Sequence, residues 1–178
     1  MYQSVLQFWY HEIEPAQWWK VDPSFDELVA ERFGRIHHKA ASGELFEWRS
    51  TPQGRLAEVI VLDQFSRNIF RNDRRAFEHD AQALALAQEA VASGADNQLT
   101  QEERTFLYMP YMHSESQLIH VIAEELFRKY APRGNYEFEL RHKEIVDRFG
   151  RYPHRNTLLG RQSTPEELQF LTEPGSRF

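Results

Sequence analysis

The sequence predicts an all-α fold, in which antiparallel helical hairpins form an array or bundle of about 7–9 helices. Three observations predict it. Apolar residues recur at helical spacing, helix start and stop signals return roughly every 15–30 residues, and no segment shows the sustained alternation of a strand. The predicted loops are short, which favours antiparallel neighbours.

The composition is that of a globular chain with a packed core. The 178 residues are 41% hydrophobic and include eight glycines and eight prolines. No linker is long enough to divide them, so we expect one all-helical domain over residues 1–178. Cysteine is absent, which excludes disulfides, thiolate metal sites and cysteine nucleophiles and fits a reducing compartment.

Hydropathy and charge limit the kinds of partner. The first residues lack the basic and apolar regions of a signal peptide, and no run approaches the roughly 20 apolar residues of a membrane span. We therefore expect a soluble cytoplasmic protein with no membrane partner. The net charge of −6 gives no general attraction to nucleic acid, so any anion site has to be local.

The first two long helices have clear starts. Asp22-Pro23 is an N-cap followed by proline at the first helical position, and the helix should end near Ser42-Gly43. Its apolar positions are Phe25, Leu28, Val29, Phe33 and Ile36. Thr51-Pro52 starts a second helix that runs through Phe65 or beyond.

The middle of the chain predicts three further helices. Asn72-Asp73 should start one that carries Phe77, Ala81, Leu84 and Val91 and ends before Ser93-Gly94. Thr100 and Glu103 form a capping box for a shorter helix, which Pro110 should end. The next helix should run from Ser114 to about Tyr130. Its polar stripe consists of His113, Gln117, His120 and Glu124, opposite Ile119, Ile122, Leu126 and Tyr130. We expect this stripe to face solvent, or to form a pocket wall if the first half of the chain packs over it.

The last helices are predicted at residues 135–149 and after Thr164. Gly150 permits a left-handed end to the first of them, and Thr164 with Glu167 forms a capping box for the second, which should end near Leu171.

Asp63 and Arg67 lie on one stripe of a helix that is apolar nearly all round. Such a helix is usually central, so both side chains should point into an interior or a cleft. They could form a structural ion pair that holds helices together. Alternatively Arg67, Asn68 and Arg71, with Gln64 on a neighbouring stripe, present donors to a cavity that accepts a carboxylate or phosphate.

His142 lies inside the apolar stripe of the helix at 135–149. It is either a satisfied core histidine or an acid, base or donor, because modest burial moves an imidazole pKa across neutrality. Glu139 and His142 match the Glu-x-x-His spacing of di-iron bundles, but only one copy occurs. We therefore expect no metal site, and no cofactor is indicated.

The segment from Phe149 to Arg161 is the strongest local signal. Pro153 can occupy the first turn of a new helix, which would place free backbone amides beside His154 and Arg155, an arrangement that can bind an anion. The same residues could instead form a helix junction whose arginines satisfy carbonyl groups of the preceding helix.

Three ordered motifs carry a family resemblance. They are Asp63-Gln64-Phe65-x-Arg67-Asn68, then Met112-His113-Ser114-Glu115, then Phe149-Gly150-Arg151-x-Pro153-His154-Arg155-Asn156 with Leu159-Gly160-Arg161 after it. The chain resembles the bacterial domain-of-unknown-function family 924 over nearly its whole length, with Ser66 where that family favours proline. The resemblance implies a tetratricopeptide-like all-helical array and no characterised activity. The usual tetratricopeptide signature is not found here.

Two functions compete. The first is a pocket for a small anionic ligand, possessing catalytic candidates His113, His142, His154, Asp63 and Glu115 and ligand-binding candidates Arg67, Asn68, Arg71, Gln64, Arg151, Arg155, Asn156 and Arg161. The second is a tetratricopeptide-like module that binds an acidic peptide without catalysis. A third interpretation is that the two Arg-Asn segments, Arg67-Asn68 and Arg155-Asn156, have a purely structural role. A shared pocket requires Arg67 and Arg155 to converge; oligomeric state is not predicted.

Overall fold

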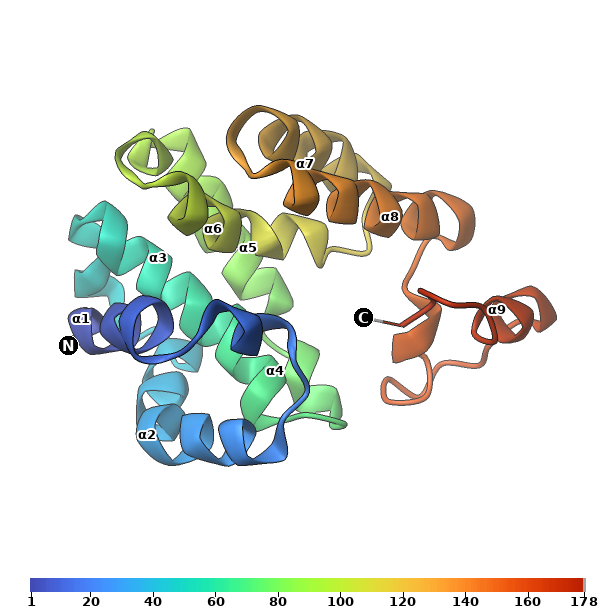
Figure 1. The fold of residues 1–178 in the computed structure, drawn as a ribbon, viewed down its shortest axis with the longest axis horizontal. Helices are drawn as coiled ribbons and strands as arrows, with labels where there is room; N and C mark the ends of the chain where they lie inside the picture. Colours follow the sequence, from blue (N-terminus) through green and yellow to red (C-terminus); the bar gives the residue numbers. More distant parts are fainter. Residues whose placement is uncertain (178) are drawn as a thin grey trace.

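The computed structural model describes residues 1–177, which form helices and connecting loops without a strand (Figure 1). The predicted all-α class is confirmed. The α-helices in chain order are α1 (Tyr2–Gln7), α2 (Pro23–Ala41), α3 (Pro52–Ile60), α4 (Ser66–Ile69), α5 (Asp80–Ala92), α6 (Gln101–Met112), α7 (Gln117–Tyr130), α8 (Arg133–Phe149) and α9 (Pro165–Phe170). Short 3₁₀ turns lie between them at Pro15–Trp19, Phe46–Ser50, Arg74–Phe77, Ala95–Gln98 and Pro153–Arg155.

The central element is one continuous helical rod. It starts at the Thr51 N-cap as α3, passes through a π-helical turn at Val61–Phe65 and continues as α4 to Ile69. The prediction of a long helix through Phe65 is confirmed. Every residue of the π turn is buried, and such turns re-aim side chains at the centre of a protein.

Helices that follow one another in sequence pack against one another. α5 packs on α6, α6 on α7 and α7 on α8, while α1 lies against α3 and α2 lies against the π turn and α4. Figure 1 shows this succession, with the segment after α8 projecting to one side. The tetratricopeptide-like character of the array stays a prediction.

Two hydrophobic clusters hold the described residues together. The larger one joins α1 to α7 and is rich in aromatic rings, among which Trp9 packs edge-on against Phe65 and Phe106. The smaller one consists of Ile145, Val146 and Tyr152, with Phe149 and Phe170 against them. The C-terminal segment therefore rests on a small cluster of its own.

The local start and stop signals formed as predicted at four places. Asp22 accepts hydrogen bonds from the amides of Ser24 and Phe25, and complete capping boxes begin α6 at Thr100 and α9 at Thr164. Gly150 ends α8 with φ at 69°, the left-handed conformation that glycine adopts most readily.

The predicted helix start at Asn72-Asp73 is wrong. Asp73 caps only the 3₁₀ turn at Arg74–Phe77, through a bond from the Arg75 amide, and α5 begins at Asp80. An acidic residue is favoured in the first turn of a helix, where amide groups are unpaired. The interruption turns Asp80 toward arginines from two other elements.

The predicted end of α6 at Pro110 is also wrong, because the helix continues to Met112. Proline removes one amide donor from a helix and crowds the carbonyl four residues earlier. All residues from Thr105 to Met112 are buried, and their packing outweighs this cost.

The prediction of a solvent-facing polar stripe on α7 is wrong at its centre, where His120 has no exposed surface and bonds Glu139 of α8. Gln117 of the same stripe is exposed and His113 and Glu124 are partly buried, while the apolar Leu118, Val121 and Ile122 also face outward. The helix starts at Gln117, after a Ser116 N-cap, and not at Ser114. The hydrogen bond between His120 of α7 and Glu139 of α8 explains why this polar side chain is buried.

Within residues 1–177 there is no helix whose length and apolar character would suffice to cross a membrane.

Candidate functional site

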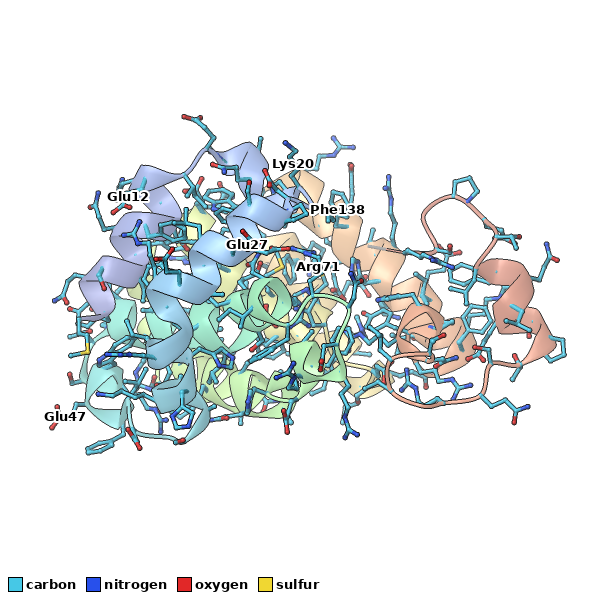
Figure 2. All side chains as sticks on the ribbon, turned by 90° about the horizontal axis from the view of Figure 1, so that it is seen from below. Glu12, Lys20, Glu27, Glu47, Arg71 and Phe138 are labelled. Carbon is cyan, nitrogen blue, oxygen red and sulfur yellow. The ribbon has the colours of Figure 1, made fainter. Side chains whose placement is uncertain are left out.

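A cavity of about 840 Å³ lies where six separate segments of the chain meet. They are the residues just before α2, the segment from Gln64 to Phe77, the end of α6 with His113, the first half of α8, residues 154–158 and Arg177. Figure 2 labels three of the lining residues, Lys20, Arg71 and Phe138, near one another around the middle of the view. A cavity of this size can hold a small molecule.

The charged side chains that line the cavity are all basic. Five cationic residues contribute to the wall, and among residues 1–177 no aspartate or glutamate does; the five are Lys20, Arg67, Arg71, Arg155 and Arg177. Trp18, Trp19, Phe77, Met109 and Phe138 form much of the apolar wall. A smaller cavity of about 330 Å³ beside α8 has Glu144 and Glu173 in its wall, so it lacks this character.

Arg67 and Arg155 converge on one carboxylate. Both Nη atoms of Arg67 donate to Asp80, at 2.9 and 3.1 Å, and Nη1 of Arg155 donates to Asp80 Oδ2 at 3.2 Å. Arg155 also donates to the carbonyl oxygen of His113 at 3.0 Å. The convergence that a shared pocket requires is therefore present, and the two Arg-Asn segments meet at one wall.

Asn68 and Arg71 are held by a second carboxylate, Asp26 of α2. Asn68 Nδ2 donates to Asp26 Oδ1 at 2.8 Å, and Arg71 binds the same carboxylate through Nε and Nη2. Nη1 of Arg71 has no hydrogen-bond partner within residues 1–177, and it carries two further donors. The Arg71 guanidinium group is thus held in place by Asp26, and its Nη1 hydrogens are available to a ligand.

Asp63 and His113 form a buried pair of ionisable groups at the cavity. Asp63 has 1% of its surface exposed and sits behind His113, whose Nδ1 lies 2.7 Å from Asp63 Oδ1. Gln64 Nε2 donates to Asp63 Oδ2 at 2.6 Å, and Arg67 Nη1 lies 3.1 Å from Oδ1. The inward orientation predicted for Asp63 and Arg67 is confirmed.

These contacts set the protonation states of the pair. Burial by itself raises the pKa of Asp63, but Arg67, His113 and Gln64 outweigh it and hold this pKa well below its usual range. Burial and the charge of Arg67 lower the pKa of His113 against the opposing effect of Asp63. At neutral pH Asp63 is therefore ionised and His113 is neutral.

An ionised carboxylate only accepts hydrogen bonds, so the ring hydrogen of neutral His113 resides on Nδ1. Nε2 then carries a lone pair. It has no partner among residues 1–177, and His113 lines the cavity. The pair has the arrangement of a base oriented by a carboxylate.

His142 and His154 line the same cavity. Burial lowers the pKa of His142 to about 3, and Nδ1 of this ring donates to the Phe138 carbonyl at 2.8 Å. Burial and Arg155 lower the pKa of His154 to about 3. Both rings are neutral at pH 7, and the predicted inward position of His142 is confirmed.

Glu139 does not act together with His142, although the Glu-x-x-His spacing placed them together. Its Oε1 lies 2.7 Å from His120 Nδ1, and His120 Nε2 donates to the Ser114 carbonyl at 2.8 Å. Both side chains are fully buried. The pair joins α7 to α8 beneath the cavity.

Five of the predicted site residues do not line the cavity; they are Asp63, which lies behind His113, and Glu115, Arg151, Asn156 and Arg161. Glu115 binds Arg161 and the amide of Tyr152, while Arg151 binds Glu167 and Asn156 bonds Ser163 and Glu167. The Glu115 contacts attach the segment after α8 to the connection between α6 and α7, whereas the Glu167 and Ser163 contacts lie within that segment. The structure places these side chains away from the cavity.

Sequence reasoning missed both carboxylates that position the arginines. Asp26 lies in the first turn of α2 and Asp80 in the first turn of α5, where acidic residues are common for purely local reasons. The aromatic wall from Trp18 and Trp19 was also missed. No spacing in the sequence links these residues to the Arg-Asn segments.

Comparison with known proteins found one matching family and a similar solved structure. A family model described as "Bacterial protein of unknown function (DUF924)" matches residues 5–175. The chain belongs to this family. The resemblance seen in the sequence motifs is thereby confirmed.

A solved DUF924-like structure is similar as well. It is described as a protein of unknown function, ATU0120, from Agrobacterium tumefaciens, and it shares 34% sequence identity and a TM-score of 0.91, covering 96% of each chain. No curated protein matches this DUF924 chain. The comparisons therefore identify the family and the fold, and they indicate no activity.

Proposed function

We propose that this DUF924 protein binds a small anionic molecule, bearing a carboxylate or a phosphate, in the 840 Å³ cavity. The observation that carries the proposal is the charge of the wall, because five cationic side chains line the cavity and no aspartate or glutamate among residues 1–177 does. Arginine forks suit carboxylate and phosphate groups because they donate two parallel hydrogen bonds.

The arginines are positioned before any ligand enters. Asp26 and Asp80 hold three guanidinium groups by charged hydrogen bonds, so little side-chain freedom is left to lose on binding. The neutral ring of His113 is oriented by Asp63 and has a lone pair on Nε2, which supports a role in proton transfer and hence an enzymatic function. A peptide-binding module is the competing proposal, but the convergence of Arg67 and Arg155 on Asp80 favours a compact ligand over an extended one.

The test is calorimetric titration of the full chain with inorganic phosphate and with 3-phenylpropanoate. Arg71→Gln should weaken the binding of at least one probe about tenfold or more, since a hydrogen bond to a charged group contributes roughly 1.5–3 kcal/mol. Native mass spectrometry of freshly purified protein would identify a retained ligand.

Arg75→Gln is the matched control. Arg75 holds Asp73 through Nε and Nη2, as Arg71 holds Asp26, but it is exposed and lies outside the cavity. Its replacement should leave binding unchanged. Absence of binding by the unaltered protein, or equal loss in both variants, would contradict the proposal.

A further inference from the structure

Some polar side chains of the cavity have a hydrogen-bond acceptor atom without a partner, and these atoms indicate which groups the ligand carries. Gln64 Nε2 donates to Asp63, and because a carboxylate cannot donate, the amide orientation is fixed and Oε1 is left over. The same argument applies to Asn68, whose Nδ2 donates to Asp26 and whose Oδ1 is left over. Both residues line the cavity.

His113 adds a third acceptor beside these two. Its Nδ1 hydrogen points to Asp63, so the lone pair of Nε2 is available. The three acceptor atoms have no hydrogen-bond partner within residues 1–177. None of them is fully buried, so each keeps some exposed surface. They are therefore reached from the cavity.

The three acceptors come from one region of the wall. Gln64 and His113 share the carboxylate of Asp63, with contacts of 2.6 and 2.7 Å, and Gln64 and Asn68 lie four residues apart along the rod, on the same side of the helix. A ligand group that fills this region has to donate hydrogen bonds. An acidic group alone cannot, because a carboxylate or phosphate dianion only accepts.

The donor group has to be neutral. A cationic amine would donate well, but five cationic side chains line the same cavity and would repel it. A hydroxyl group donates without charge. The aromatic wall of Trp18, Phe77 and Phe138 suits the carbon skeleton that joins the hydroxyl to the acid.

We propose that the ligand is a hydroxylated acid, meaning a hydroxy carboxylate or a hydroxylated phosphate ester, whose hydroxyl groups donate to His113 Nε2, Gln64 Oε1 and Asn68 Oδ1. This inference rests on the proposed function, since the acidic group of the same molecule faces the arginines. Recognition of the hydroxyl separates this class from simple acids of the same size, because an acid without it leaves the three acceptors unpaired.

The experiment measures the affinities of two matched pairs of probes by calorimetry on the full chain. The pairs are 3-phenyllactate, as each enantiomer, against 3-phenylpropanoate, and glycerol 3-phosphate against propyl phosphate. In at least one pair the hydroxylated member should bind about five- to tenfold more tightly, the effect of one neutral hydrogen bond. The advantage should disappear in His113→Phe.

Asn68→Leu is a second, milder variant, because Asp26 keeps Arg71 as its partner. It should reduce the advantage at least twofold if His113→Phe fails to fold. Asn97→Leu, at an exposed position outside the cavity, is the control and should leave the advantage intact.

The outcomes separate the two proposals. If neither member of either pair binds, the proposed function is overturned. If both members of each pair bind within twofold of each other, the anion site stands and the hydroxyl inference is overturned. An advantage that persists in both cavity variants would also overturn it.

Discussion

Arg67 and Arg155, from elements far apart in the sequence, donate to the same carboxylate, that of Asp80. Asp80 thereby links α4, α5 and the 3₁₀ turn after α8 at one wall of the cavity. Both guanidinium groups share this carboxylate, while Arg67 also contacts Asp63 and Arg155 also donates to the His113 carbonyl.

Asp80→Asn should lower the free energy of unfolding by about 2–4 kcal/mol, because two guanidinium groups lose their shared counter-charge. The effect should stay below that of a fully buried pair, since the side chains of Arg67 and Asp80 are 20% and 19% exposed. Urea denaturation at pH 7 measures it.

Asp73→Asn is the control for that experiment, because Asp73 holds Arg75 at an exposed site and asparagine caps a helical turn nearly as well. It should change stability by less than about 0.5 kcal/mol. An equal loss in the two variants would contradict the role assigned to Asp80.

The ring tautomer of His113 is a direct test of the Asp63 contact. In the unaltered protein at pH 7, the imidazole ¹⁵N shifts of His113 should report hydrogen on Nδ1 and a lone pair on Nε2. Asp63→Asn removes the ionised acceptor and should shift the ring toward the tautomer with hydrogen on Nε2. Finding hydrogen on Nε2 in the unaltered protein would contradict the proposed base.

Stability should fall as the pH is lowered from about 7 to 5. The pKa values of His37, His142 and His154 are lowered by burial, to about 4, about 3 and about 3, whereas an unfolded histidine titrates near 6.5. Below pH 6.5 the unfolded chain therefore binds more protons than the folded protein, which favours unfolding. The expected loss at pH 5 is roughly 1–2 kcal/mol for each histidine.

Glu139 opposes this trend in part, because burial raises its pKa and the folded protein then takes up a proton earlier than the unfolded chain does. Urea denaturation across pH 7 to 5 gives the net slope. His142→Gln should reduce that slope, and the exposed His38→Gln should not. An unchanged slope in His142→Gln would show that this ring does not contribute.

The C-terminal segment should unfold locally when its ion pairs are broken. Glu167 binds Arg151 at 2.6 and 2.8 Å and also accepts from Thr164 and Asn156, so Glu167→Gln weakens several contacts at once. Hydrogen exchange should accelerate in α9 while it stays slow in α3, because the small cluster around Tyr152 is separate from the main core.

Glu166→Gln is the neighbouring control, since Glu166 is exposed and its contact with Arg148 contributes little. Exchange that accelerates equally throughout the protein in Glu167→Gln would indicate global unfolding, and would contradict a separately stable segment.

The local features of this fold could be predicted from short stretches of the chain. Helix starts at Asp22, Thr100 and Thr164 and the end at Gly150 depend on hydrogen bonds and backbone conformations within a few residues, so their signals are local. The inward position of Asp63 followed equally from the apolar surroundings of its helix.

The pairing of polar side chains from distant elements depends on how the helices pack and could not be predicted from local patterns. The buried face of α7 was set by the His120–Glu139 pair, and α6 passes Pro110 because its neighbours are all buried. Asp80 reaches Arg155 across a long stretch of sequence, and no periodicity encodes such a contact. Packing between distant elements selects these partners, since burying a charged group is favourable only when a complementary group arrives with it.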